Sequence, residues 1–253
     1  MTWPAEAIWE GVSALLPDFT VEILPEVDSS NTELMRRARA GQMEPVLLVA
    51  ERQTAGRGRL GRGWQSSPGE SLTFSLGLPL APADWSGLSL AVGVSLAESL
   101  HPQVRLKWPN DLWLADRKLA GVLIETASFG EGRAARRYAV VGVGINIAAR
   151  PAEGLSTAPA WLHELLPGVT PGEVLARVIV PLVQSLQAFE LAGFAGFQAR
   201  FDARDALRDR PVVLSDGVTG TAHGTTDTGA LLVHTPAGMK TVTSSEVSVR
   251  PAA

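Results

Sequence analysis

The most chemically suggestive segment of the sequence is the run GRGRLGRGW at residues 56–64, which holds four glycines, three arginines and one tryptophan. Glycine lets a backbone approach a ligand closely and adopt positive φ angles. Arginine presents a planar fork of N–H donors that matches phosphate and carboxylate oxygens, and the ring of Trp64 offers a face for stacking. The composition therefore predicts a loop that closes over an anionic ligand containing a ring, such as a nucleotide.

The glycines at positions 56, 58 and 61 also match the dinucleotide-binding pattern G-x-G-x-x-G. That pattern requires a helix directly after the glycines, whereas a long loop and a strand-like segment follow them here. The sequence also lacks the catalytic segments of protein kinases and the Walker phosphate-binding pattern. Two other interpretations of the run stay open at this point, an Arg-Gly tract that binds RNA and a cluster of surface turns.

A second group of cations and polar side chains occupies residues 107–121, in the segments KWPND and RKLAG. Asn110 and Asp111 are typical of a turn, so Lys107 precedes a sharp turn and Lys118 begins the following strand. Cations and polar groups that converge at strand ends suit a carboxylate or a phosphate. The alternative is a β-hairpin whose lysines are merely solvated.

A third segment, VGVGIN at residues 141–146, places Gly142 and Gly144 inside a strand pattern. Glycine weakens a strand unless a ligand or another backbone comes close, but this segment alone is a weak signal. The polar run at 29–31 is equally well explained by helix capping. The four histidines show no metal-ligand spacing, and the chain has no cysteine, so the sequence predicts no metal site made by protein side chains.

Composition narrows the class of protein. The 253 residues carry a formal net charge of −4, with 45% hydrophobic and 19% charged residues, as is ordinary for a globular chain. The absence of cysteine suits a reducing compartment. No secretory signal is visible, and no uninterrupted apolar run approaches the roughly 18 residues of a membrane span. We therefore expect a cytoplasmic protein that binds neither DNA nor a membrane.

The elements that must position these motifs do not alternate regularly. A capping box at 30–33 predicts a helix that Gly41 ends, and other helix patterns cover 3–16, 85–100, 171–191 and 194–207. Strand patterns cover 20–27, 46–51, 71–78, 104–108, 111–115, 119–126 and 138–147. This order is not a βαβ alternation, so we predict an α+β fold with a mixed sheet and helices against it.

The texture of the sequence changes after Pro211. Short β runs separated by glycine-containing turns follow at 212–214, 231–233 and 247–249. About forty residues of short strands suggest a small β-barrel. We expect two domains, 1–206 and 207–253.

Taken in this order, the motifs resemble those of the biotin protein ligase family. The similarity begins at DSSN (28–31) and continues through ERQTA (51–55), GRGRLGRGW, KWPNDLWL, RKLAGVLIE, GVGIN, RPV (210–212) and GALL (229–232). It implies a catalytic core similar to class II aminoacyl-tRNA synthetases, followed by an SH3-like barrel. Members of the family use ATP to activate biotin as biotinyl-5′-AMP and transfer it to a lysine of an acceptor domain, usually the biotin carboxyl carrier protein.

The resemblance implies a role for each motif residue. Because a carboxylate and a triphosphate must meet, cations would offset their repulsion, and the catalytic residues would be Lys118, Arg57, Arg59 and Lys107. Biotin would be bound by Ser29, Ser30, Asn31, Gln53, Arg57, Gly58, Arg59, Lys118, Gly121 and Gly142. The nucleotide would be bound by Arg62, Trp64, Lys107, Asn110, Asp111, Gly144 and Asn146. Mg²⁺ would arrive with ATP rather than lie in a protein cage.

The resemblance also bears on partners. Only about twenty residues precede the similar region, so we expect no winged-helix DNA-binding domain and no regulation through DNA. Nothing in the pattern decides between a monomer and a homodimer formed through an exposed sheet. A lipoate-type acyl-adenylate protein ligase and a non-enzymatic nucleotide- or RNA-binding protein are the alternative functions.

Overall fold

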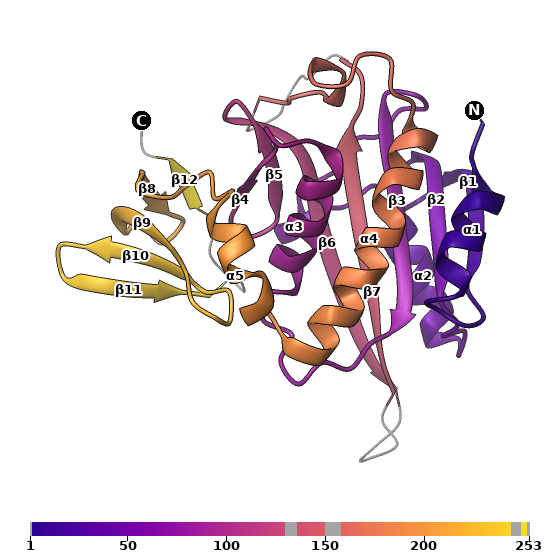
Figure 1. Ribbon diagram of the computed structural model, residues 1–253, viewed down its shortest axis with the longest axis horizontal. Coiled ribbons are helices and arrows are strands. Elements are labelled where there is room, and N and C mark those ends of the chain that lie inside the picture. Colours follow the sequence, from indigo (N-terminus) through magenta and orange to yellow (C-terminus); the bar gives the residue numbers. More distant parts are fainter. Residues whose placement is uncertain (1, 130–135, 150–157, 244–248, 252–253) are drawn as a thin grey trace.

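The computed structural model describes residues 2–129, 136–149, 158–243 and 249–251. Its main feature is a seven-stranded sheet with helices on both faces, in the order β1-β2-β3-β7-β6-β5-β4 (Figure 1). The strands are β1 (Thr20–Val27), β2 (Val46–Gln53), β3 (Ser71–Pro79), β4 (Arg105–Lys107), β5 (Asp111–Leu114), β6 (Arg117–Phe129) and β7 (Arg136–Asn146). The helices are α1 (Ala5–Ser13), α2 (Ser30–Arg39), α3 (Leu88–Leu100), α4 (Pro171–Ala192) and α5 (Ala195–Asp202).

The sheet is mixed, as the sequence predicts. β1 and β2 are parallel, and the other neighbouring strands are antiparallel. The predicted α+β class is therefore confirmed at this level. The predicted elements match the observed ones within a few residues, except that α1 and the last helix, α5, are shorter than their patterns.

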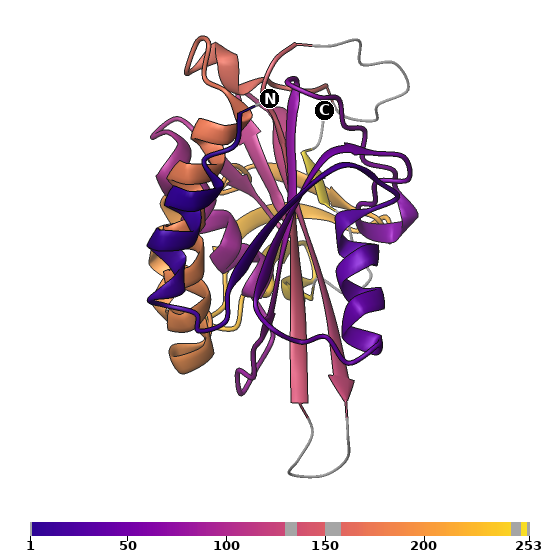
Figure 2. The same ribbon diagram turned by 90° about the vertical axis from the view of Figure 1, so that its right-hand side faces the viewer.

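The two faces of the sheet are covered differently. Side chains such as Phe74 and Val143 belong to the main hydrophobic core beneath α1, α3 and α4. On the opposite face, Leu34 of α2 packs in a smaller cluster with Leu48 and Val140. Figure 2 shows this layering, with α1 and α4 on one side of the sheet and α2 on the other. α2 covers only part of its face of the sheet, and the cavity of the candidate site lies on the remaining part.

The cap of α2 differs from its prediction. The N-cap is Ser29 rather than Ser30, and its side chain accepts a hydrogen bond from the backbone N–H of Thr32. Glu33 does not close a capping box, because its carboxylate pairs instead with Arg36 and Arg37 one turn later on the helix. The prediction failed because three consecutive polar residues each fit a cap, and only the fold selects among them. Ser30 is thereby free for another partner.

α4 is a long and apolar helix. By length and composition it is apolar enough to cross a membrane, unlike the other helices that the structure describes. Its residues Val174, Val178 and Leu182 are fully buried in the main core. Burial between α3 and α1 therefore accounts for this composition.

A separate five-stranded sheet follows in the chain, in the order β11-β10-β9-β8-β12. Its strands are β8 (Pro211–Leu214), β9 (Thr219–Thr225), β10 (Leu231–Thr235), β11 (Gly238–Val242) and β12 (Val249–Pro251). The first two predicted β runs are confirmed, whereas the third lies mostly outside the described residues. The two sheets meet at Trp108, whose Nε1 donates a hydrogen bond of 3.0 Å to the carbonyl of Gly229.

Candidate functional site

A cavity of about 860 Å³ lies on the part of the sheet that α2 leaves uncovered. Strand register supplies its floor: Thr73 pairs with Gly144, and Ser75 pairs with Gly142. Directly paired residues point to the same face of a sheet, so this face carries small and polar side chains. Every site residue predicted from the sequence lines the same cavity.

One end of the cavity holds a hydrogen-bonded group of polar side chains, Ser30, Asn31, Gln53 and Ser75, called here the polar bed. The backbone N–H and the hydroxyl of Ser30 donate to Oε1 of Gln53 at 2.8 and 3.1 Å. Ser75 Oγ lies 2.6 Å from Oδ1 of Asn31 and 2.7 Å from Oγ of Ser30. Asn31 Nδ2 donates to the carbonyl of Leu123 and to the carboxylate of Glu125.

The polar bed has more acceptors than protons. Its three hydroxyl contacts join Ser30 to Gln53, Ser75 to Ser30, and Ser75 to Asn31. Two hydroxyls supply only two protons for these three contacts, so the three cannot all be hydrogen bonds at once, and a hydroxyl oxygen of the bed keeps a lone pair open. A ligand that brings its own N–H groups can donate to such a lone pair.

The GRGRLGRGW run, residues 56–64, forms a folded lid over this cavity. Its backbone turns back on itself, because Gly58 N–H donates to the carbonyl of Arg62 at 2.7 Å and Trp64 N–H donates to that of Gly56 at 2.8 Å. Leu60 at the tip has φ 56° and is 58% exposed. The lid is thus a hairpin whose tip faces solvent and whose arginines surround the cavity.

Two glycines of β7 make room for protein side chains. A Cβ atom on Gly144 would lie 2.3 Å from the ring of Trp64, and one on Gly142 would lie 2.1 Å from Oδ1 of Asn31. From the sequence, we expect these glycines to let the ligand itself approach the strand closely. In the structure their immediate role is to seat Trp64 and Asn31 against the sheet.

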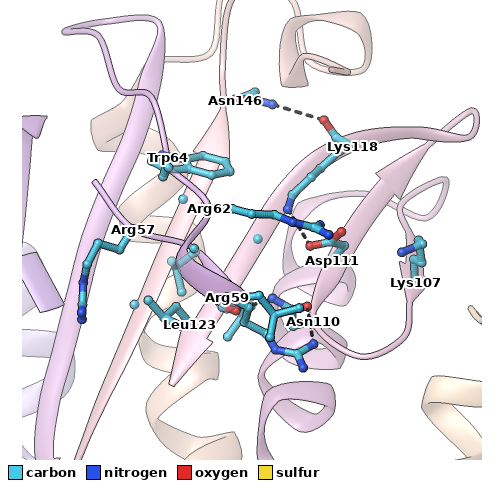
Figure 3. Close-up of a pocket in the computed structure, with 18 of the residues that line it drawn as sticks. Arg57, Arg59, Arg62, Trp64, Lys107, Asn110, Asp111, Lys118, Leu123 and Asn146 are labelled. Atoms are coloured by element: carbon cyan, nitrogen blue, oxygen red, sulfur yellow. Dashed lines mark hydrogen bonds and ion pairs between the residues drawn. The ribbon is translucent and has the colours of Figure 1, made fainter. Parts of the chain in front are cut away.

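Cations gather at the other end of the cavity (Figure 3). Lys118 Nζ lies 2.7 Å from Oδ1 of Asp111 and 5.9 Å from the centre of the Trp64 ring. Arg59 contacts Asn110 Oδ1 at 3.4 Å. Arg57 instead points away from this group (Figure 3).

Burial changes the acidity of two of these cations. Burial lowers the pKa of the Lys107 amine, an effect that Asp111 opposes and that nearby cations, including Arg250, reinforce. Burial also lowers the pKa of the Arg59 guanidinium, again opposed by Asp111. The carboxylate of Asp111 therefore faces several cations. Because positive charge is in excess, this end of the cavity attracts an anion.

Sequence reasoning missed four residues near this cavity. Ser75 belongs to the polar bed and Glu125 contacts it, while Arg210, directly before β8, and Arg250 of β12 line the cavity. Ser75 could have been found from the alternation of polar residues along the strand at 71–78. Within the described parts of the chain, no group of three or more acidic or histidine side chains could hold a metal ion.

Comparison with known proteins gives consistent matches. Residues 24–146 match the Biotin/lipoate A/B protein ligase family, and residues 209–250 match the biotin protein ligase C terminal domain. The bifunctional ligase/repressor BirA of Escherichia coli is 38% identical over 92% of this chain and 75% of its own length. The biotin--[acetyl-CoA-carboxylase] ligase of Paracoccus denitrificans is 34% identical over 89% of this chain and 98% of its own.

A solved structure agrees. The biotin protein ligase from Aquifex aeolicus in complex with biotin and ATP has a TM-score of 0.76 to this chain and 32% sequence identity. The similarity covers 92% of this chain and 99% of that one. Both sheets described above therefore lie within a shared architecture.

Proposed function

The chain belongs to the biotin protein ligase family, and we propose how its cavity performs the two steps of that activity. The enzyme uses ATP to activate biotin as biotinyl-5′-AMP and then transfers the biotinyl group to a lysine of an acceptor protein. The observation that carries our assignment is the polarity of the cavity: an acceptor-rich bed lies at one end and cations at the other.

The polar bed suits the fused urea ring of biotin. A cyclic urea has two N–H donors, which match the bed formed by Ser30, Asn31 and its partners. Ser29, Gln53, Gly58 and Gly121 complete the proposed biotin site. Biotin's carboxylate then extends along the sheet toward Lys118.

In the first step an oxygen of the biotin carboxylate attacks the α-phosphorus of ATP. The new O–P bond forms as the bond to pyrophosphate breaks, and pyrophosphate leaves with the electron pair. Lys118, Lys107 and Arg59 stabilise the converging negative charge. Arg62 and Asn146 bind the nucleotide beside them, and Trp64 packs against the adenine. Mg²⁺ accompanies the phosphates of ATP.

In the second step the neutral amine of an acceptor lysine attacks the acyl carbon of the adenylate, and AMP leaves. The adenylate is a mixed anhydride that water would destroy. The lid at 56–64 excludes water until the acceptor arrives. The proposed acceptor is a biotin carboxyl carrier protein domain, and the proposed location is the cytoplasm.

The finer architecture is part of the same proposal. We divide the chain into a catalytic domain at 1–206, similar to class II aminoacyl-tRNA synthetases, and an SH3-like domain at 207–253. Arg210 and Arg250 support a role of the second domain at the nucleotide end, because both line the cavity. 

A transfer assay tests the assignment. The protein is incubated with a carrier domain, ATP and either biotin or lipoate, and the carrier is examined by mass spectrometry. We expect one biotinyl group on the carrier and no lipoyl group. Lipoylation without biotinylation would favour the lipoate-type alternative, and no transfer of either acid would overturn the proposal.

A further inference from the structure

Glu125 joins the lid to the polar bed. It lies on β6 opposite Val140, two residues beyond Leu123, which lies opposite Gly142. Its Oε2 accepts a hydrogen bond of 3.0 Å from Nδ2 of Asn31. The same oxygen accepts a hydrogen bond from the guanidinium of Arg57 in the lid.

These contacts explain the orientation of Arg57. Its side chain points away from Arg59 and Lys118 (Figure 3), toward the carboxylate of Glu125. The lid is therefore held from two sides, by Arg57 on Glu125 and by Arg59 on Asn110. Both contacts are made by side chains, so either can be changed without altering the lid backbone.

The location of Glu125 requires an explanation. A carboxylate beside the proposed site for two anions, the biotin carboxylate and ATP, opposes their binding. Its charge is offset by Arg57 in the ion pair. Its second contact orients Asn31, whose Nδ2 is directed to Glu125 and Leu123, so that Oδ1 faces Ser75 in the polar bed.

We propose that Glu125 is a positioning residue of the ligase reaction: it holds the lid over the reactive adenylate through Arg57 and orients the biotin-binding amide of Asn31. The inference rests on the proposed function of this cavity. Its two contacts are separable. Glu125→Gln keeps an oxygen for Asn31 and removes the charge that pairs with Arg57, whereas Glu125→Ala removes both contacts.

The two variants therefore have different expected effects. Glu125→Gln releases biotinyl-5′-AMP about two- to fivefold faster, the size expected for a partly exposed ion pair, with the Kd for biotin close to wild type. Glu125→Ala also releases biotinyl-5′-AMP faster than wild type, and in addition its Kd for biotin rises several-fold. Release is followed from the preformed enzyme–adenylate complex, and the Kd for biotin is measured by calorimetry.

A double-mutant cycle tests whether Glu125 acts through Arg57. The release rates of Arg57→Gln, Glu125→Gln and the double variant are compared. If the pair acts as a unit, adding Glu125→Gln to Arg57→Gln produces no further acceleration. Independent, multiplying effects in the double variant would overturn the proposal, as would a Glu125→Gln release rate equal to wild type.

Glu22→Gln is the matched control, because Glu22 also pairs with an arginine, Arg37, at 2.8 Å and lies outside the cavity lining. Its release rate should equal that of wild type. Raising the salt concentration should accelerate release more in wild type than in Glu125→Gln, because only wild type has the ion pair to screen. An equal salt response in both would count against the proposal.

Measurements on Arg57→Gln and on wild type separate a loss of folding from a loss of function. If Glu125→Gln does not fold, Arg57→Gln on the exposed lid provides the second test, and an unchanged release rate there overturns the proposal. Biotin-dependent pyrophosphate release by wild type tests the proposed function itself. Its absence defeats that function, whereas active wild type with an unaffected Glu125→Gln defeats only the role of Glu125.

Discussion

The Asn31 amide occupies the space above Gly142, where a Cβ atom would lie 2.1 Å from its Oδ1. Two residues further along β7, the ring of Trp64 occupies the equivalent space above Gly144. Residues two apart on a strand share a face. Adjacent glycines on one face thus seat the side chains that we assign to the two halves of the adenylate.

Gly142→Ala should impair biotin binding selectively. The new methyl group meets Asn31 Oδ1 and forces the amide off the sheet, which disrupts its hydrogen bond to Ser75. Loss of such buried hydrogen bonds raises the KM for biotin by about tenfold or more. Steady-state pyrophosphate release at varied biotin and varied ATP measures the effect, and an equal rise in both KM values would contradict the separation.

Gly144→Ala should have the complementary effect. Its Cβ would lie 2.3 Å from Cε2 of Trp64, so the indole must move and the KM for ATP rises by about tenfold, while the KM for biotin changes little. Gly121→Ala is the control, because its Cβ would lie no closer than 3.2 Å to the flexible end of Lys118 and 3.7 Å from Oδ1 of Asp111. A larger ATP defect in Gly121→Ala than in Gly144→Ala would refute the role of the Trp64 seat.

Lys118→Ala should nearly abolish adenylate formation. Its ammonium pairs with Asp111 at 2.7 Å inside the cavity, and removing one such charge from a reaction centre lowers kcat by about 10²- to 10³-fold. Pre-steady-state pyrophosphate release measures the step, and the melting temperature checks the fold. Lys240→Ala is the control, since Lys240 pairs with Asp216 at the similar distance of 2.8 Å, outside the cavity lining. Normal pyrophosphate release by Lys118→Ala would exclude its catalytic role.

Lys107 should make ATP binding sensitive to alkaline pH. Burial lowers the pKa of its amine below the ordinary value of 10.5. A lysine is cationic below its pKa, so its attraction for phosphate is present at neutral pH and is lost as pH rises through the lowered pKa. The KM for ATP should therefore increase at a pH below 10.5 in wild type and stay flatter in Lys107→Ala. Parallel pH profiles for the two proteins would contradict this.

Asp205 should lower the stability of the protein at neutral pH. Burial raises the pKa of its carboxyl from 3.8 to about 6, and Oδ2 has no hydrogen-bond partner among the described residues. Between these values the folded state holds a proton that the unfolded state has released. The contribution of Asp205 to stability is therefore greatest below pH 3.8 and falls as pH rises to about 6, by at most about 3 kcal/mol.

Asp205→Asn tests that sign. The amide oxygen keeps the hydrogen bond from the backbone N–H of Leu207 and carries no charge. The variant should gain stability relative to wild type at pH 7.5 by more than it does at pH 4, as measured by urea unfolding. A stability difference that is the same at both pH values would rule out the raised pKa.

Local patterns in the sequence determined much of this protein. Hydrophobic periodicity located most strands, because burial of one or both faces of a strand determines which of its consecutive residues are apolar. Every site residue that the motifs identified lines one cavity, but the motifs did not identify Ser75 or Glu125. Local patterns failed where neighbours compete for one role, as at the α2 cap, which the structure gives to Ser29.

Only the tertiary structure decided which distant residues share a contact. Asn31 and Glu125 are 94 residues apart and meet because α2 lies across β6 and β7. Ser75 reaches the polar bed through the register of β3 with β7. Sequence spacing carries no information on such pairs, since strand order and register set them. For the same reason, the seats of Asn31 and Trp64 on Gly142 and Gly144 became visible only in the folded chain.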